Sequence, residues 1–107
     1  MAKPAMSLLS LIPPETFDLP VSIPRAGHPP AVVRFTFRRR MRSEMLALTE
    51  ELRRLDDAPC ILRVAVDWEL SDPFNAENVR TLCETLPGAG YAVVQAYLDA
   101  TFGHRKH

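Results

Sequence analysis

Trp68, the only tryptophan of the chain, lies among acidic residues that could bind a metal ion or transfer protons. Asp67, Glu69 and Asp72 place three carboxylates within six residues. Calcium sites, however, need about six or more oxygen ligands in a loop that usually contains glycine, and the spacing of an EF-hand loop is absent. We therefore interpret this segment as a solvated acidic turn, expect no metal or cofactor there, and predict that Trp68 is a buried core residue.

A second group with possible chemistry combines arginines with aromatic residues, as in proteins that bind single-stranded nucleic acid. Phe35 and Phe37 share one face of an alternating segment with Val33, whereas Arg34 and Arg38 fall on the other face. The aromatic rings should therefore point inward, out of reach of a bound base. We interpret the basic cluster as a docking patch for an acidic partner or a solvated face, and do not expect nucleic-acid binding. A small nucleic-acid-binding regulatory protein remains the alternative function, using Arg38, Arg39, Arg40 and Arg42.

Histidines and cysteines offer little for catalysis. His28 lies in a proline-rich segment and the other two histidines, His104 and His107, lie at the end of the chain, so no histidine is placed beside a nucleophile and a carboxylate. Cys60 and Cys83 lack the spacing of metal ligands and suit buried, reduced thiols, with a disulfide between them as an alternative. We predict a non-enzyme.

Composition limits the other function classes. The 107 residues are 47% apolar and carry a formal net charge of zero, which favours one domain over residues 1–107 and gives no overall attraction to nucleic acid or membrane. Residues 1–14 are expected to be a loosely attached or partner-contacting segment. No run approaches the ~20 apolar residues of a membrane span, and the N-terminus lacks a signal-peptide pattern. We expect a cytoplasmic protein.

The first third of the chain predicts extended structure, because seven of the ten prolines precede Ala31. Residues 17–23 alternate between apolar and polar types, with prolines in the polar phase, which predicts an edge strand. Residues 25–30 read as a loop, and the alternation around Phe35 predicts a second strand. The two strands should form an antiparallel pair.

The rest of the chain predicts helices. Ser43 is expected to cap a helix that runs to about Leu55. Residues 60–66 fit a strand or a helix, and we interpret them as a short helix because Pro59 suits a first helical turn. Asn75 is a predicted N-cap, with Phe74 and Val79 as a hydrophobic staple. The last helix should end at Gly103 and bury one line of side chains, comprising Tyr91, Val94, Leu98 and Phe102. The predicted fold is α+β, with an N-terminal antiparallel strand pair packed on a small helical bundle.

The second half of the chain resembles a known family in the order of its motifs. VDWEL, SDPFNAENV, LPGAG and QAYLDA, between residues 59 and 102, are similar to the tail assembly chaperones of long-tailed bacteriophages and prophages. The resemblance also implies helix at residues 60–66. It implies a non-catalytic chaperone of virion assembly in the bacterial cytoplasm that binds the tape measure protein and helps to recruit tail tube subunits. The motifs look structural, so no binding residue is carried over from the family.

Apolar residues in excess of a small core indicate where a partner could bind. Leucines are concentrated near the N-terminus, and methionine side chains adapt to varied partners. We therefore expect a homo-oligomer with an apolar contact surface. The candidate residues, besides the four arginines above, are Met6, Leu8, Leu9, Leu11, Ile12, Met41 and Met45.

Overall fold

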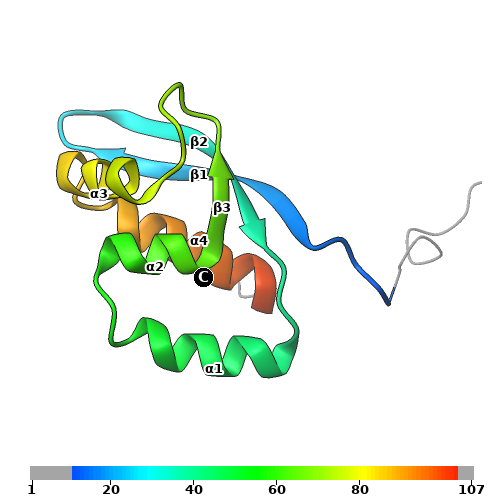
Figure 1. The fold of residues 1–107 in the computed structure, drawn as a ribbon. Helices are drawn as coiled ribbons and strands as arrows, with labels where there is room; N and C mark the ends of the chain where they lie inside the picture. Colours follow the sequence, from blue (N-terminus) through cyan, green and yellow to red (C-terminus); the bar gives the residue numbers. More distant parts are fainter. Residues whose placement is uncertain (1–10, 104–107) are drawn as a thin grey trace, which may run out of the picture.

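The computed structural model describes residues 11–103 of the chain. Over these residues the fold is α+β, as predicted, with an antiparallel sheet whose third strand lies between helices in the sequence (Figure 1). The elements in chain order are β1 (Thr16–Arg25), β2 (His28–Arg38), α1 (Arg42–Leu52), α2 (Asp57–Val64), β3 (Ala65–Trp68), α3 (Ala76–Thr85) and α4 (Ala89–Phe102).

The strands β1 and β2 form a long hairpin, and β3 adds to the other side of β2. The predicted pair is therefore confirmed, and β1 is an edge strand. Phe17 pairs with Phe37, and Leu19 pairs with Phe35, so the apolar positions of both strands lie on one face. The expected loop over residues 25–30 is wrong in extent, because a tight turn joins Arg25 to His28. Gly27 lies in that turn with φ of +77°, a value that glycine adopts without strain.

Residues 60–66 combine the two structures between which the sequence was ambiguous. Helix α2 ends at Val64 and β3 begins at the next residue. The interpretation as a helix is right up to Val64 and wrong beyond it, because Ala65 and Trp68 pair with Phe37 and Phe35 of β2. Trp68 thus lies at the end of a strand, and the acidic turn begins after it.

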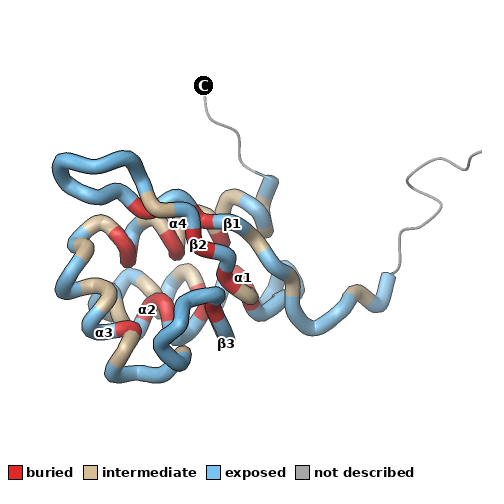
Figure 2. Tube along the Cα trace, turned by 90° about the horizontal axis from the view of Figure 1, so that it is seen from above, coloured by how far each residue is buried: buried red, intermediate tan, exposed pale blue. Residues whose placement is uncertain are grey.

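The helices cover one face of the sheet, and the core lies between them (Figure 2). Inward-facing residues of the hairpin share one buried cluster with residues of every helix, whereas the residues at the tip of the hairpin are exposed. Among residues 11–103, the side chains with no exposed surface are Ile23, Phe35, Phe37, Met45, Ile61, Val64, Val79, Ala89, Val93 and Tyr97.

Helix α1 begins two residues earlier than the predicted cap would place it. The expectation that Ser43 caps it is wrong, because Met41 is the N-cap and its backbone N–H donates to the Glu44 side chain at 2.7 Å. Glutamate three residues after the cap can satisfy this otherwise free donor. The helix ends at Leu52, and Leu55 lies in the turn that follows it.

Helix α3 starts as predicted. The Asn75 side chain accepts from the backbone N–H of Asn78 at 2.8 Å, and Val79 is fully buried. Phe74 packs against the core and meets the ring of Trp68 edge to face at 5.1 Å. Trp68 is 7% exposed, confirming its predicted burial, and its Nε1 donates to the carbonyl of Asp72 at 2.7 Å. Its ring contacts are with Phe74 and with Phe35 of β2.

Two glycines allow the start of α4 to approach its neighbours closely. A Cβ atom at position 88 would lie 2.8 Å from Cγ of Pro24 in β1, and one at position 90 would lie 2.5 Å from Cβ of Asp57 in α2. Neither position has room for a side chain unless a neighbour moves. Gly103 ends the helix with φ of +73°, the predicted C-cap.

Candidate functional site

The basic cluster at the end of β2 is divided between structural and exposed arginines. Arg39 joins the sheet to the segment before it, because its backbone N–H donates to the carbonyl of Glu15 at 2.7 Å and its Nε donates to that of Pro14 at 3.0 Å. Its guanidinium also lies 5.1 Å from the centre of the Phe17 ring, at cation–π distance. Arg39 is nevertheless exposed, so these contacts give it a structural role, and its part in a solvated or docking face stays a prediction.

Arg40 is also part of the fold. Its Nη1 donates to the hydroxyl of Tyr97 at 3.1 Å, and its Nη2 donates to the carbonyl of Arg63 at 2.7 Å. The Tyr97 hydroxyl in turn donates to the carbonyl of Arg38 at 2.7 Å and lies 3.4 Å from Sδ of Met45. This network joins α4, the end of β2 and the end of α2, so Arg40 has a structural role and is half-buried rather than fully solvated, and a docking role for it stays a prediction.

The remaining candidates near this cluster differ in exposure. Arg38 and Arg42 face solvent, and Met41 is 61% exposed, so these three residues are accessible to a partner. Met45 lies on the inner face of α1 and is fully buried. The prediction that Met45 belongs to a partner-binding surface is therefore wrong, because the i, i+3 spacing from Met45 to Leu48 is the buried face of the helix.

The N-terminal candidates are only partly within the described residues. Leu11 and Ile12 are 89% and 88% exposed, and the segment before β1 leads away from the sheet (Figure 1). Met6, Leu8 and Leu9 lie outside the described residues. The exposure of Leu11 and Ile12 agrees with a role in contacting a partner.

The groups that could have carried chemistry have structural surroundings. Asp67 accepts from the backbone of Trp68, and Glu69 forms an exposed ion pair with Arg34 at 3.6 Å. Among residues 11–103, no group of three His, Cys, Asp or Glu side chains could hold a metal ion. Within the same residues, no helix is long and apolar enough to cross a membrane.

Both cysteines are free thiols, so the alternative disulfide is not formed. Burial raises the pKa of Cys60 above its ordinary value, and the nearby carboxylates of Asp57 and Asp56 raise it further. The pKa of Cys83 is also raised, mainly by burial and further by the nearby carboxylate of Asp57. The neutral thiol is therefore favoured in both, which does not suit a nucleophile.

Helix α4 supplies the surface that the sequence analysis misplaced. We predicted that Tyr91, Val94, Leu98 and Phe102 form its buried line. Instead the fully buried residues are Ala89, Val93 and Tyr97, while Tyr91 is 73% exposed. The other three residues of the predicted line are half-buried. We call this line, Tyr91, Val94, Leu98 and Phe102, the outer stripe.

The reason for the error is that α4 is apolar over most of its circumference, with Gln95 and Asp99 on one side. Among the fourteen residues of α4, only three besides its tyrosines are polar, namely Gln95, Asp99 and Thr101. Alanine, valine and aromatic residues make up most of the rest. Periodicity cannot identify the buried face of such a helix. The small residues Gly88 and Gly90 give the better signal, because close packing against Pro24 of β1 and Asp57 of α2 requires them.

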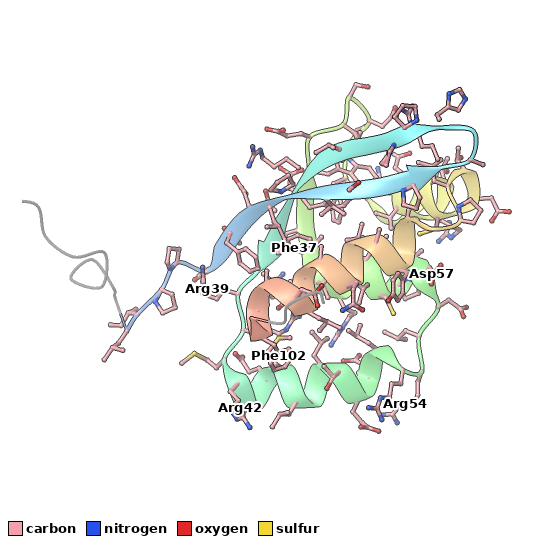
Figure 3. The ribbon with its side chains drawn as sticks, turned by 180° about the vertical axis from the view of Figure 1, so that it is seen from behind. Phe37, Arg39, Arg42, Arg54, Asp57 and Phe102 are labelled. Carbon is pink, nitrogen blue, oxygen red and sulfur yellow. The ribbon has the colours of Figure 1, made fainter. Side chains whose placement is uncertain are left out.

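Two grooves run along the sides of α4, which crosses the front of the molecule between the hairpin and α1 (Figure 3). The β1 groove has a volume of about 420 Å³ and lies between the edge strand and α4; its walls include Pro20, Ser22, Pro24, Tyr91, Ala92 and Ala96. The α1 groove has a volume of about 280 Å³ and lies between α4 and the ends of α1 and α2; its walls include Leu52, Leu55, Cys60, Tyr91 and Val94. Tyr91 lines both grooves.

The surface thus defined suits the binding of another polypeptide. It combines an exposed aromatic ring, half-buried aliphatic side chains and two shallow apolar recesses, which are features of protein-binding surfaces. The chain matches the sequence model of a family described as phage tail assembly chaperone over residues 1–107, and it belongs to that family. No curated protein and no solved structure gives a significant match.

Proposed function

We propose that this chaperone holds an apolar helical segment of the tail tape measure protein against the outer stripe and the α1 groove, and that it helps to recruit tail tube subunits. It does so without catalysing a reaction, in the cytoplasm of the bacterial host. Membership of the tail assembly chaperone family supports a binding role during tail assembly. The particular client and the surface that holds it are the proposal.

The observation that carries the proposal is the position of an apolar helix at the surface. Helix α4 has apolar side chains over most of its circumference, but only the face through Ala89, Val93 and Tyr97 is fully buried. Soluble proteins seldom leave connected apolar surface uncovered unless a partner binds it. A helical client could place its side chains in the α1 groove at i, i+3 and i+4 spacing.

The alternative function, nucleic-acid binding by the arginine cluster, has less support. Arg38, Arg39 and Arg42 are exposed, but Arg39 is already engaged with the Pro14 carbonyl, and Arg40 is engaged with the Arg63 carbonyl and with Tyr97. Phe35 and Phe37 are fully buried and cannot stack on bases. A few exposed arginines without an aromatic platform do not make a single-strand binding surface.

The test is to co-express the full chain with the tape measure protein of the same phage or prophage and to measure soluble complex by affinity capture. Tyr91→Asp should abolish capture, because it places a charge between the two grooves without disturbing the core. Leu46→Asp is the matched control, since Leu46 is 54% exposed on α1 away from the grooves. Equal capture by both variants would refute the proposed surface.

Salt dependence separates this proposal from the alternative. An apolar complex should persist between about 50 and 200 mM salt, an interval over which a surface that neutralises several phosphates loses on the order of 10³-fold in affinity. Tight nucleic-acid binding that falls steeply with salt would favour the regulatory alternative.

A further inference from the structure

We propose that the β1 groove is the receptor for the N-terminal arm, residues 1–15, of a second copy of this chain. Copies would then associate head to tail, each giving its arm to one neighbour and accepting the arm of another. The proposal rests on three observations, namely the direction of the arm, the chemistry of the β1 edge and the apolar pattern of the arm. It does not depend on the client proposed above.

Residues 11–15, the part of the arm that the structure describes, lead away from the sheet of their own copy (Figure 1). The carbonyls of Pro14 and Glu15 are held by Arg39, so the chain enters β1 along the line of the sheet. Pro13 and Pro14 lie in no helix or turn, and the backbone bends at Leu11 and Ile12. The groove begins at Pro20, four residues or about 13 Å further along β1 in the opposite direction. Leu11 and Ile12 are exposed and therefore accessible to a neighbouring copy.

The edge of β1 is poorly suited to pairing with another strand. The backbone N–H of Glu69 donates to the carbonyl of Arg34 at 2.9 Å, so the backbone of Arg34 faces away from β1. Pro20 pairs with Arg34, and its own backbone consequently faces the open edge. Proline has no N–H to donate, so the ladder at this edge is interrupted. An occupant of the β1 groove must be recognised mainly by its apolar side chains.

The sequence of the arm supplies such side chains. At helical spacing Ala5, Leu8, Leu9 and Ile12 fall on one side, and Ser7 and Ser10 fall on the other. Eight residues at this spacing would extend about 12 Å. The β1 groove follows α4 from Gly88 to Asp99, eleven residues or about 17 Å, which is long enough to receive them.

The contact is heterologous, because the arm and the groove are different surfaces of one chain. Such contacts close into rings or continue as open assemblies. An assembly of this kind would present several copies of the outer stripe side by side. Binding of one long client by several copies would then gain from avidity.

The experiment measures the mass of the full chain by light scattering across the micromolar range, with no tape measure protein present. The arm variant carries Leu8→Asp and Leu9→Asp. The groove variant carries Pro20→Glu, which puts a charge at an exposed position of the groove wall. Ser22→Glu, at another exposed position of the same wall, replaces it if Pro20→Glu lowers the melting temperature. Leu46→Asp serves as the control.

We expect wild type and the control to exceed the mass of a monomer, and each of the other variants alone to be monomeric. An equimolar mixture of the arm variant and the groove variant should form a one-to-one pair and nothing larger, because the pair contains one intact arm, one intact groove and no further pair of complementary surfaces. A monomeric wild type, a groove variant with the mass of wild type, or a mixture that stays monomeric would each overturn the proposal. Loss of client capture with this pairing intact would instead refute the proposed function alone.

Discussion

Replacing Tyr97 by phenylalanine should destabilise the fold although it removes a single oxygen atom. The Tyr97 hydroxyl is fully buried, donates to the carbonyl of Arg38 at 2.7 Å and accepts from Arg40 at 3.1 Å. The variant leaves the Arg38 carbonyl without this donor, whereas Arg40 is half-buried and keeps its bond to the carbonyl of Arg63. Most of the cost therefore comes from the carbonyl.

A buried polar group that loses its partner costs about 1–3 kcal/mol. In a domain of roughly 100 residues each kcal/mol lowers the melting temperature by about 4–8 °C, so we expect a decrease between about 4 and 24 °C. Thermal and urea unfolding of the full chain would measure it. A double-mutant cycle with Arg40→Met should give a coupling free energy of about 0.5 kcal/mol or more, because the two side chains share one hydrogen bond.

Tyr91→Phe is the matched control, since it removes the same atom from a 73% exposed ring on the same helix. Its free energy of unfolding should remain within about 0.5 kcal/mol of wild type. If Tyr97→Phe is also within that range, the reasoning about the buried network is refuted.

Three further changes test other parts of the structure. Trp68→Ala should cost about 3–5 kcal/mol in urea unfolding, because the ring fills the space between Phe35 and Phe74, and a melting temperature near that of wild type would contradict its core role. Arg40→Gln should lower the melting temperature while Arg38→Gln does not, and equal effects would show that Arg40 is no more structural than its exposed neighbour. Because the pKa of Cys60 is raised, its thiol in the folded chain should be alkylated only at more alkaline pH than in the unfolded chain. The contribution of the neutral thiol to stability should be present below about pH 9 and lost as the pH rises through the folded pKa. Equal alkylation profiles in the folded and unfolded chain would show that the pKa is not raised.

The parts of the fold that sequence reasoning identified are those specified by local signals. Alternation from Phe17 to Ile23 with proline in the opposite phase defined an edge strand, and Asn75 defined the start of α3. Strand β3 was missed because it has only four residues and directly follows a helix, so its pairing with β2 depends on long-range contacts. A short apolar run carries no periodicity that separates helix from strand.

The candidate site was harder to predict than the fold. The exposed residues Leu11, Ile12 and Met41 were correctly placed at the surface, but nothing in the sequence marks Arg40 as the partner of Tyr97, 57 residues away. The outer stripe was assigned to the core because a largely apolar helix gives no indication of which face is buried. In a binding protein the functional surface shares the composition of the core, and this removes the signal on which sequence reasoning relies.

Gly88 and Gly90 also act as spacers that set the width of both recesses at once. Gly88 forms part of the wall of the β1 groove and Gly90 part of the wall of the α1 groove. A methyl group at either position would require Pro24, Asp57 or α4 itself to shift, and a shift of α4 would change the shape of both recesses. Under the two proposals above, the affinity of a copy for its neighbour and its affinity for a client would therefore be coupled at these two positions.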